Sequence, residues 1–203
     1  MEKWNNYEEE LQEHYTRAIR EIQASGKAAK DVVGESYEKF RSNQIKKFEN
    51  LDTATPVEAS LFDQRFGGVY TADHYIVEKE SRKILAIEED KGHYVDKPFA
   101  KRAIFNAAEV FHHCYKMGYE VPYFVLSCPT KYDIESLLES QKGMFNTSVG
   151  AMLLAKFKFF SACDHGRTSR KKYLIDKQMP FEVNPFNVYK ESEFFGWLNK
   201  QCD

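Results

Sequence analysis

The sequence contains few cysteines, and their spacing excludes the common cysteine-based sites. Cys114, Cys128, Cys163 and Cys202 are the four in 203 residues, and no two are close enough for a Cys-x-x-Cys pair. Zinc ribbons and iron–sulfur clusters use such pairs, so neither is expected. We therefore expect reduced thiols, as in proteins of the reducing cytoplasm.

Long hydrophobic runs are also absent. A membrane-spanning helix needs about 20 consecutive apolar residues, whereas the longest apolar run, residues 149–154, is followed closely by Lys156 and Lys158. The first residues, Met-Glu-Lys-Trp-Asn, lack the apolar core of a secretory signal peptide. The sequence therefore predicts a cytoplasmic protein that does not associate with membranes.

No excess of one charge marks the chain as a nucleic-acid-binding protein. Its 29 basic and 31 acidic residues give a net charge of −2, which provides no general positive field for a phosphate backbone. A local basic face and an acidic metal site can still coexist at this net charge. The chain has no P-loop, no G-x-G-x-x-G fingerprint and no G-x-S-x-G elbow, which argues against enzymes built on those motifs.

The most informative pattern is an apolar run that ends in Glu89, one spacer residue and Lys91. Side chains alternate between the two faces of a strand, so Glu89 and Lys91 point one way and Glu88 and Asp90 the other. If Asp73 belongs to the neighbouring antiparallel strand, its carboxylate reaches the same edge. Two carboxylates and a lysine at a sheet edge can bind a hard divalent cation and activate water for phosphodiester cleavage.

Helical and strand patterns succeed one another around this motif. Apolar residues recur every three or four positions in the expected helices, and apolar runs bounded by turn residues mark the expected strands. Residues 52–56 are expected to form a turn-rich break. The expected helices span residues 3–24, 28–48, 56–62 and 98–117, and the expected strands span residues 68–71, 73–79, 83–90 and 121–128.

The last third of the chain is harder to assign from its pattern. Residues 149–160 are mostly apolar and ambiguous; a helix is expected first and a strand second. Helices are expected at 133–141 and 191–200, and short strands at 173–175 and 186–189. With one continuous pattern of this length and no linker, the chain is expected to form one domain, residues 1–203.

Asp73 and the Glu89-Asp90-Lys91 triplet, with the surrounding α-β-β-β-α-β order over residues 26–128, resemble the PD-(D/E)xK nuclease superfamily, which includes most type II restriction endonucleases. The family often has proline before the aspartate, and this chain has Ala72. The resemblance implies an α/β fold with a restriction-endonuclease-like core, a mixed central sheet flanked by helices. N-terminal helices (1–50) would precede the catalytic core (51–128), and a C-terminal extension (129–203) would follow it.

The resemblance also implies a Mg²⁺-dependent endonuclease that hydrolyses DNA, with Mn²⁺ able to substitute. Asp73, Glu89 and the Asp90 carbonyl would hold the metal, and Lys91 would orient or deprotonate the attacking water and offset phosphate charge. Many members add a glutamate from the helix before the sheet, for which Glu35 is favoured over the alternative Glu58. The competing interpretation is a cross-strand salt bridge on a solvated strand face.

The most basic stretch of the chain supplies candidate contacts to phosphates and base edges. The expected contacts to double-stranded DNA are Lys97, Lys101, Arg167, Thr168, Ser169, Arg170, Lys171 and Lys172. Symmetric cleavage of a palindromic duplex needs two equivalent sites, so a sequence-specific restriction enzyme is expected to be a homodimer. A phage or repair nuclease, a viral RNA-cleaving nuclease and a non-catalytic nucleic-acid-binding protein remain alternatives.

Overall fold

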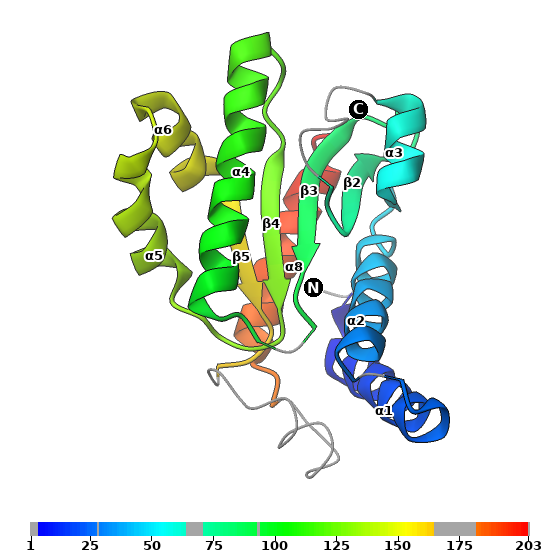
Figure 1. The fold of residues 1–203 in the computed structure, drawn as a ribbon. Coiled ribbons are helices and arrows are strands. Elements are labelled where there is room, and N and C mark those ends of the chain that lie inside the picture. Colours follow the sequence, from blue (N-terminus) through cyan, green and yellow to red (C-terminus); the bar gives the residue numbers. More distant parts are fainter. Residues whose placement is uncertain (1–3, 28, 64–70, 93, 165–181, 203) are drawn as a thin grey trace.

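A single mixed β-sheet organises the chain. The computed structural model describes residues 4–27, 29–63, 71–92, 94–164 and 182–202. The five strands lie in the order β1-β2-β3-β4-β5, antiparallel from β1 to β3 and parallel from β3 to β5, so β3 lies in the centre (Figure 1). The strands are β1 (Leu51–Ala54), β2 (His74–Glu78), β3 (Ile84–Asp90), β4 (Tyr123–Cys128) and β5 (Phe157–Ser161).

Helices α1 (Tyr7–Ser25), α2 (Ala29–Ile45) and α8 (Pro185–Asn199) pack on one face of this sheet. Buried residues recur every three or four positions in α1 and α8; α1 packs mainly on α2, and α8 packs on β5. Gly26 ends α1 in the left-handed conformation, with φ of 66°, which glycine adopts without steric cost. The core on this face is rich in aromatic rings and includes Tyr7, Tyr37 and Phe195.

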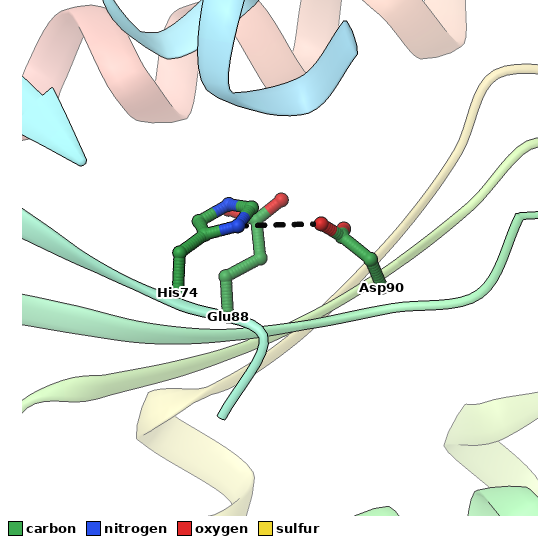
Figure 2. Close-up of side chains that lie close together, drawn as sticks. All are labelled: His74, Glu88 and Asp90. Carbon is green, nitrogen blue, oxygen red and sulfur yellow. Dashed lines mark ion pairs between the residues drawn. The ribbon is translucent and has the colours of Figure 1, made fainter. Parts of the chain in front are cut away.

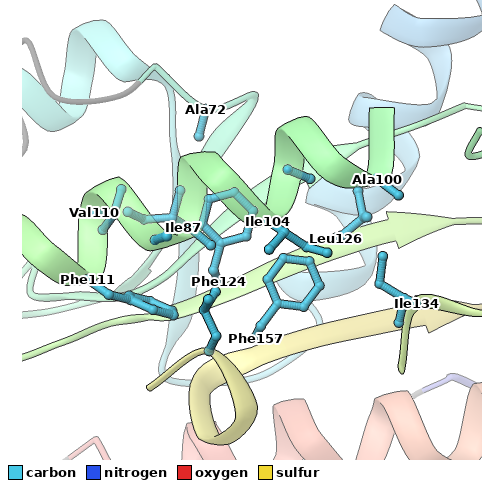
Figure 3. Packing of buried hydrophobic residues seen from close by; sticks show 14 of the residues in the cluster. Ala72, Ile87, Ala100, Ile104, Val110, Phe111, Phe124, Leu126, Ile134 and Phe157 are labelled. Atoms are coloured by element: carbon cyan, nitrogen blue, oxygen red, sulfur yellow. The ribbon is translucent and has the colours of Figure 1, made fainter. Parts of the chain in front are cut away.

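The opposite face is covered by α4 (Lys97–Met117), with α5 (Ile134–Gln141) and α6 (Thr147–Lys156) beside it. Asp96 caps the start of α4 and Gly118, in the left-handed conformation, ends it. Figure 3 shows α4 side chains meeting those of β3, β4 and β5, where the rings of Phe124 and Phe157 stack with centroids 5.6 Å apart. Two short helices, α3 (Pro56–Phe62) and the 3-10 helix Lys142–Met144, complete the described elements.

The expected order of elements is present only from β2 to β4. The first strand precedes the helix at 56–62 in place of following it, so the order from α2 to β4 is α-β-α-β-β-α-β. Residues 51–54, within and beside the expected turn, form β1 and pair with β2 in the register Leu51↔Glu78. The polar pair Asp52-Thr53 suggested a turn, yet Leu51 and Ala54 at its ends are buried. The expected strand at 68–71 falls mainly outside the described residues, and residue 71 is not in a strand.

Two predictions near the C-terminus were wrong or incomplete. Residues 149–160 divide into both expected alternatives, because α6 ends at Lys156 and β5 begins at Phe157. Residues 186–189 are helical rather than extended, since Asn184 caps α8 and Pro185 occupies its first turn. The expected strand at 173–175 lies outside the described residues. Among the helices that the structure describes, none is both long and apolar enough to cross a membrane.

Candidate active site

The end of β3 sends its polar side chains to both faces of the sheet. Ile87 belongs to the core under α4, and Glu88 is buried on the face covered by α2 and α8. Alternation then places Glu89 and Lys91 on the α4 face and Asp90 on the α2 face. Lys91 extends to α4, where its Nζ lies 4.3 Å from the centroid of the Phe99 ring.

Asp73 lies where β2 begins, beside the end of β3. Its Oδ2 accepts a hydrogen bond of 2.6 Å from the backbone N–H of Asp90. The ladder pairs His74 with Glu88, so one step further along it Asp73 lies beside Glu89. Burial raises the pKa of the half-buried Asp73, and the negative charge of Glu88 adds to this effect. The Asp90 N–H, His74 and, more weakly, Lys91 oppose it. The carboxylate of Asp73 and the ammonium group of Lys91 therefore lie close enough to interact electrostatically.

Helix α2 brings a different glutamate from the favoured Glu35 toward this place. Glu35 is exposed, whereas Glu38, three residues later, is half-buried. Burial raises the pKa of Glu38, and the negative charge of Asp73 raises it further. The sequence pattern did not single out Glu38. Its neighbour Tyr37 belongs to the apolar stripe of this helix and is buried.

The alternative candidate, Glu58, has a structural role. It lies in the first turn of α3 and forms a capping box with Thr55, whose hydroxyl accepts from the Glu58 backbone N–H. The Glu58 carboxylate accepts in return from the Thr55 backbone N–H at 2.7 Å, and this bond lowers its pKa. Its side chain is thus used to start α3.

Positive charge gathers where α4 begins, next to Lys91. The guanidinium of Arg102 lies 4.9 Å from the centroid of the Phe99 ring that Lys91 also contacts. Lys97 is exposed and Lys101 is half-buried in the same turns. Residues 167–172, the expected basic recognition loop, lie outside the described residues, so their contacts to DNA stay a prediction.

A second constellation, which the sequence did not predict, occupies the other face of β3. Arg41 of α2 is fully buried, and its Nε donates to Glu88 Oε1 at 2.7 Å. Its Nη2 forms an ion pair of 2.6 Å with Glu191 Oε1 of α8. His74 and Asp90 complete this buried charge cluster (Figure 2). The sequence offered one signal for this cluster. Arg41 follows the apolar Tyr37 by four residues, about one helical turn, so both side chains lie on the same face of α2.

The carboxyl groups of the buried charge cluster have pKa values shifted in different directions. Burial alone would raise the pKa of Glu88, but Arg41 and His74 outweigh it and lower that pKa to about 2. Burial, together with the negative charge of Glu88, raises the pKa of Asp90 well above its ordinary value. Burial also raises the pKa of Glu191, to about 7, against the effect of Arg41. One guanidinium does not compensate all three carboxylates equally.

Comparison with known proteins adds no relative to this geometry. No protein-family model, curated protein or solved structure matches the chain.

The loop after Lys91 is held tightly by the N-terminal helices. The Tyr15 hydroxyl donates to the carbonyl of Gly92, and a Cβ at Gly92 would lie 2.8 Å from the carbonyl oxygen of Val33. We expect Gly92→Ala to lower the free energy of unfolding by about 1–3 kcal/mol, because α2 must move away from β3. Urea denaturation measures this change. Gly143→Ala is the matched control, since nothing lies within 4 Å of that position, and an equal effect of both substitutions would contradict the close contact.

Proposed function

We propose that this chain is a Mg²⁺-dependent endonuclease that hydrolyses DNA phosphodiester bonds on a restriction-endonuclease-like core. The observation that carries the proposal is the hydrogen bond from the Asp90 N–H to Asp73, which joins the upstream carboxylate to the Glu89-x-Lys91 strand end. The succession of β2, β3, α4 and β4 around it supports the same family, although α3 lies between β1 and β2. A salt bridge on a solvated strand would not need a half-buried aspartate with a raised pKa.

The donor set suits a hard cation. Asp73, Glu89 and the Asp90 carbonyl offer only oxygen ligands, which Mg²⁺ prefers and Mn²⁺ accepts. Burial disfavours the negative charge of Asp73, so a cation beside it would be stabilising. When bound, Mg²⁺ would lower the pKa of a coordinated water and offset phosphate charge.

The remaining residues of the site position the substrate. Lys91, held against Phe99, would lie beside the scissile phosphate and orient the attacking water as a fixed positive charge. Lys97, Lys101 and Arg102 in the first turns of α4 would contact the DNA backbone, where helix N-termini favour phosphate. Glu38 would face the metal from α2 and support the charge of the ion that Asp73 binds.

Incubation of plasmid DNA with the full chain and Mg²⁺ tests this proposal directly. Discrete fragments that disappear with EDTA and in Asp73→Asn are the result expected of a sequence-specific restriction enzyme. A smear of fragments that likewise disappears with EDTA and in Asp73→Asn would support a nuclease without sequence specificity. Cleavage of single-stranded RNA but not of DNA would make RNA the substrate. Absence of any cleavage would overturn the proposal in favour of a non-catalytic scaffold. Analytical ultracentrifugation of the chain, mixed with a DNA duplex that it cleaves, tests the expected homodimer.

The two glutamates of α2 give a matched pair of substitutions. Glu38→Gln is expected to raise the Mg²⁺ concentration for half-maximal cleavage by about tenfold, because it removes a negative charge that faces Asp73. Glu35→Gln, on the exposed side of the same helix, should leave it unchanged. Cleavage rates across a Mg²⁺ titration measure both. The reverse ranking would restore Glu35 as the helix carboxylate of the site.

A further inference from the structure

With all of its carboxyl groups ionised, the buried charge cluster would carry more negative than positive charge. Three carboxylates, Glu88, Asp90 and Glu191, surround the single guanidinium of Arg41, and each of these side chains is at most 2% exposed. With a neutral imidazole on His74, two negative charges are left without a counter-charge. Isolated buried charges are costly, so proteins pair them or bind them to metals.

Arg41 pairs closely with two of the three carboxylates, and its Nη1 and Nη2 form no hydrogen bond with the described residues. Its Nε donates to Glu88 Oε1 and its Nη2 pairs with Glu191, whereas Asp90 Oδ1 lies 3.9 Å from Nε. Both oxygens of Asp90, Glu88 Oε2 and His74 Nε2 are buried without a hydrogen-bond partner in the described part of the chain. Buried polar atoms are nearly always satisfied, so four such atoms in one place need a partner.

The side chains that carry these atoms lie close together, with a different ring nitrogen of His74 nearest to each carboxyl group. His74 Nε2 lies 3.8 Å from Glu88 Oε2, and His74 Nδ1 lies 3.6 Å from Asp90 Oδ2. One ligand atom from each of the three residues can be chosen so that all lie within 4.8 Å of one another. Figure 2 shows the imidazole and both carboxyl groups on the same side of the strands. In a tetrahedral zinc site with bonds of about 2.0–2.2 Å, ligands are about 3.3–3.6 Å apart, so small side-chain rotations suffice.

We propose that His74, Glu88 and Asp90 form a buried structural site for one divalent transition-metal ion, with Zn²⁺ the favoured metal. Imidazole nitrogen together with carboxylate oxygen is a donor set that Zn²⁺ accepts. Two positive charges cancel the two uncompensated negative charges of the cluster. The ion would fasten β2 to β3 beneath α2 and α8.

This site is separate from the candidate active site. It lies on the α2 face of β3 and uses the carboxylate of Asp90, whereas the active site uses the Asp90 carbonyl with Asp73 and Glu89. The proposal does not depend on nuclease activity, because a structural ion would be bound in an inactive chain as well. Protons on the carboxylates are the rival way to remove the surplus charge, and the experiment must separate protons from metal.

The test is the zinc content and thermal stability of the full chain. Protein stripped with EDTA is reloaded with Zn²⁺ and passed through a desalting column, and zinc per chain is measured by mass spectrometry. We expect one retained zinc per chain and a Tm higher by about 5–10 °C than that of the stripped protein. His74→Gln and Asp90→Asn should each abolish the retained zinc and the Tm rise.

The control variant is Glu89→Gln, which should keep the retained zinc because strand alternation places its side chain on the α4 face, away from the cluster. Zinc lost in Glu89→Gln but kept in His74→Gln would assign the metal to the candidate active site and overturn the proposal. A wild-type chain that retains no zinc would overturn it too and leave protons as the counter-charge. Asp90→Asn replaces a buried carboxyl group with a neutral amide of similar shape, so its metal-free Tm should equal or exceed that of the wild type. This Tm shows that a loss of zinc in Asp90→Asn is not caused by unfolding.

Discussion

Replacing Arg41 with methionine is expected to lower the free energy of unfolding, in the presence of EDTA, by about 3–5 kcal/mol. Methionine keeps an unbranched stem in the pocket where Arg41 packs near the rings of Trp4 and Phe195, so the main loss is the charge. Glu88 and Glu191 would then remain buried without their ion pairs. Urea denaturation followed by circular dichroism measures the change, which is a large share of the stability of a typical domain.

The pH dependence of the same variant gives an independent check. Glu88 has its folded-state pKa lowered from 4.5 to about 2, so its ion pair stabilises the fold above the unfolded pKa. That contribution is lost as pH falls from about 4.5 to about 2. The stability gap between wild type and Arg41→Met should therefore narrow over this interval. Lys39→Met, an exposed cation on the same helix, is the control, and an equal loss there would show that the cluster contributes little.

Lys91→Ala is expected to lower kcat for DNA cleavage by about 100- to 1,000-fold while the fold is retained. The lysine is held against Phe99 rather than buried in the core, so truncation removes the positive charge beside the phosphate without opening a large cavity. Single-turnover cleavage at saturating Mg²⁺ measures the chemical step. Lys116→Ala, at the far end of α4, is the matched control and should cleave as the wild type does.

The KM of the same reaction separates chemistry from binding. Removing Lys97 and Lys101 together should raise KM and weaken its dependence on salt, because phosphate contacts act through released counterions. Lys91→Ala should change kcat more than KM. If Lys91→Ala left kcat intact and raised only KM, Lys91 would be a backbone contact and the site would need another group to orient water.

Sequence alone placed the elements whose patterns are strong. The helix at 98–117 and the strands at 73–79, 83–90 and 121–128 agree with α4, β2, β3 and β4 to within two residues. Long amphipathic stripes and apolar runs bounded by turn residues fix such elements locally. The four-residue β1 was missed because its pairing with β2 outweighs the turn preference of Asp52 and Thr53, and pairing between distant residues is not written in a local pattern.

The sequence predicted in part which side chains of the candidate site lie on which face of the sheet. Alternation along β3 was enough to separate Lys91 from Glu88 and Asp90, because it depends only on strand geometry. Which helix carboxylate approaches Asp73 depends on how α2 crosses the sheet, and periodicity does not give that angle. The buried Arg41 was likewise invisible, since a lone arginine in a helix is usually solvated. Its partner Glu191 lies on α8, about 150 positions later.

The alternation of β3 also makes this strand intolerant of misalignment. A shift of one residue would exchange the two faces, placing Glu89 and Lys91 in the dry interior and moving Glu88 and Asp90 toward α4. A shift in one direction would put Lys91 in the place of Asp90 near Arg41, and a shift in the other would put Ile87 in the place of Glu88. The native register of the central strand is therefore more stable than either register shifted by one residue, because only the native register pairs the buried Arg41 with both Glu88 and Asp90 on β3.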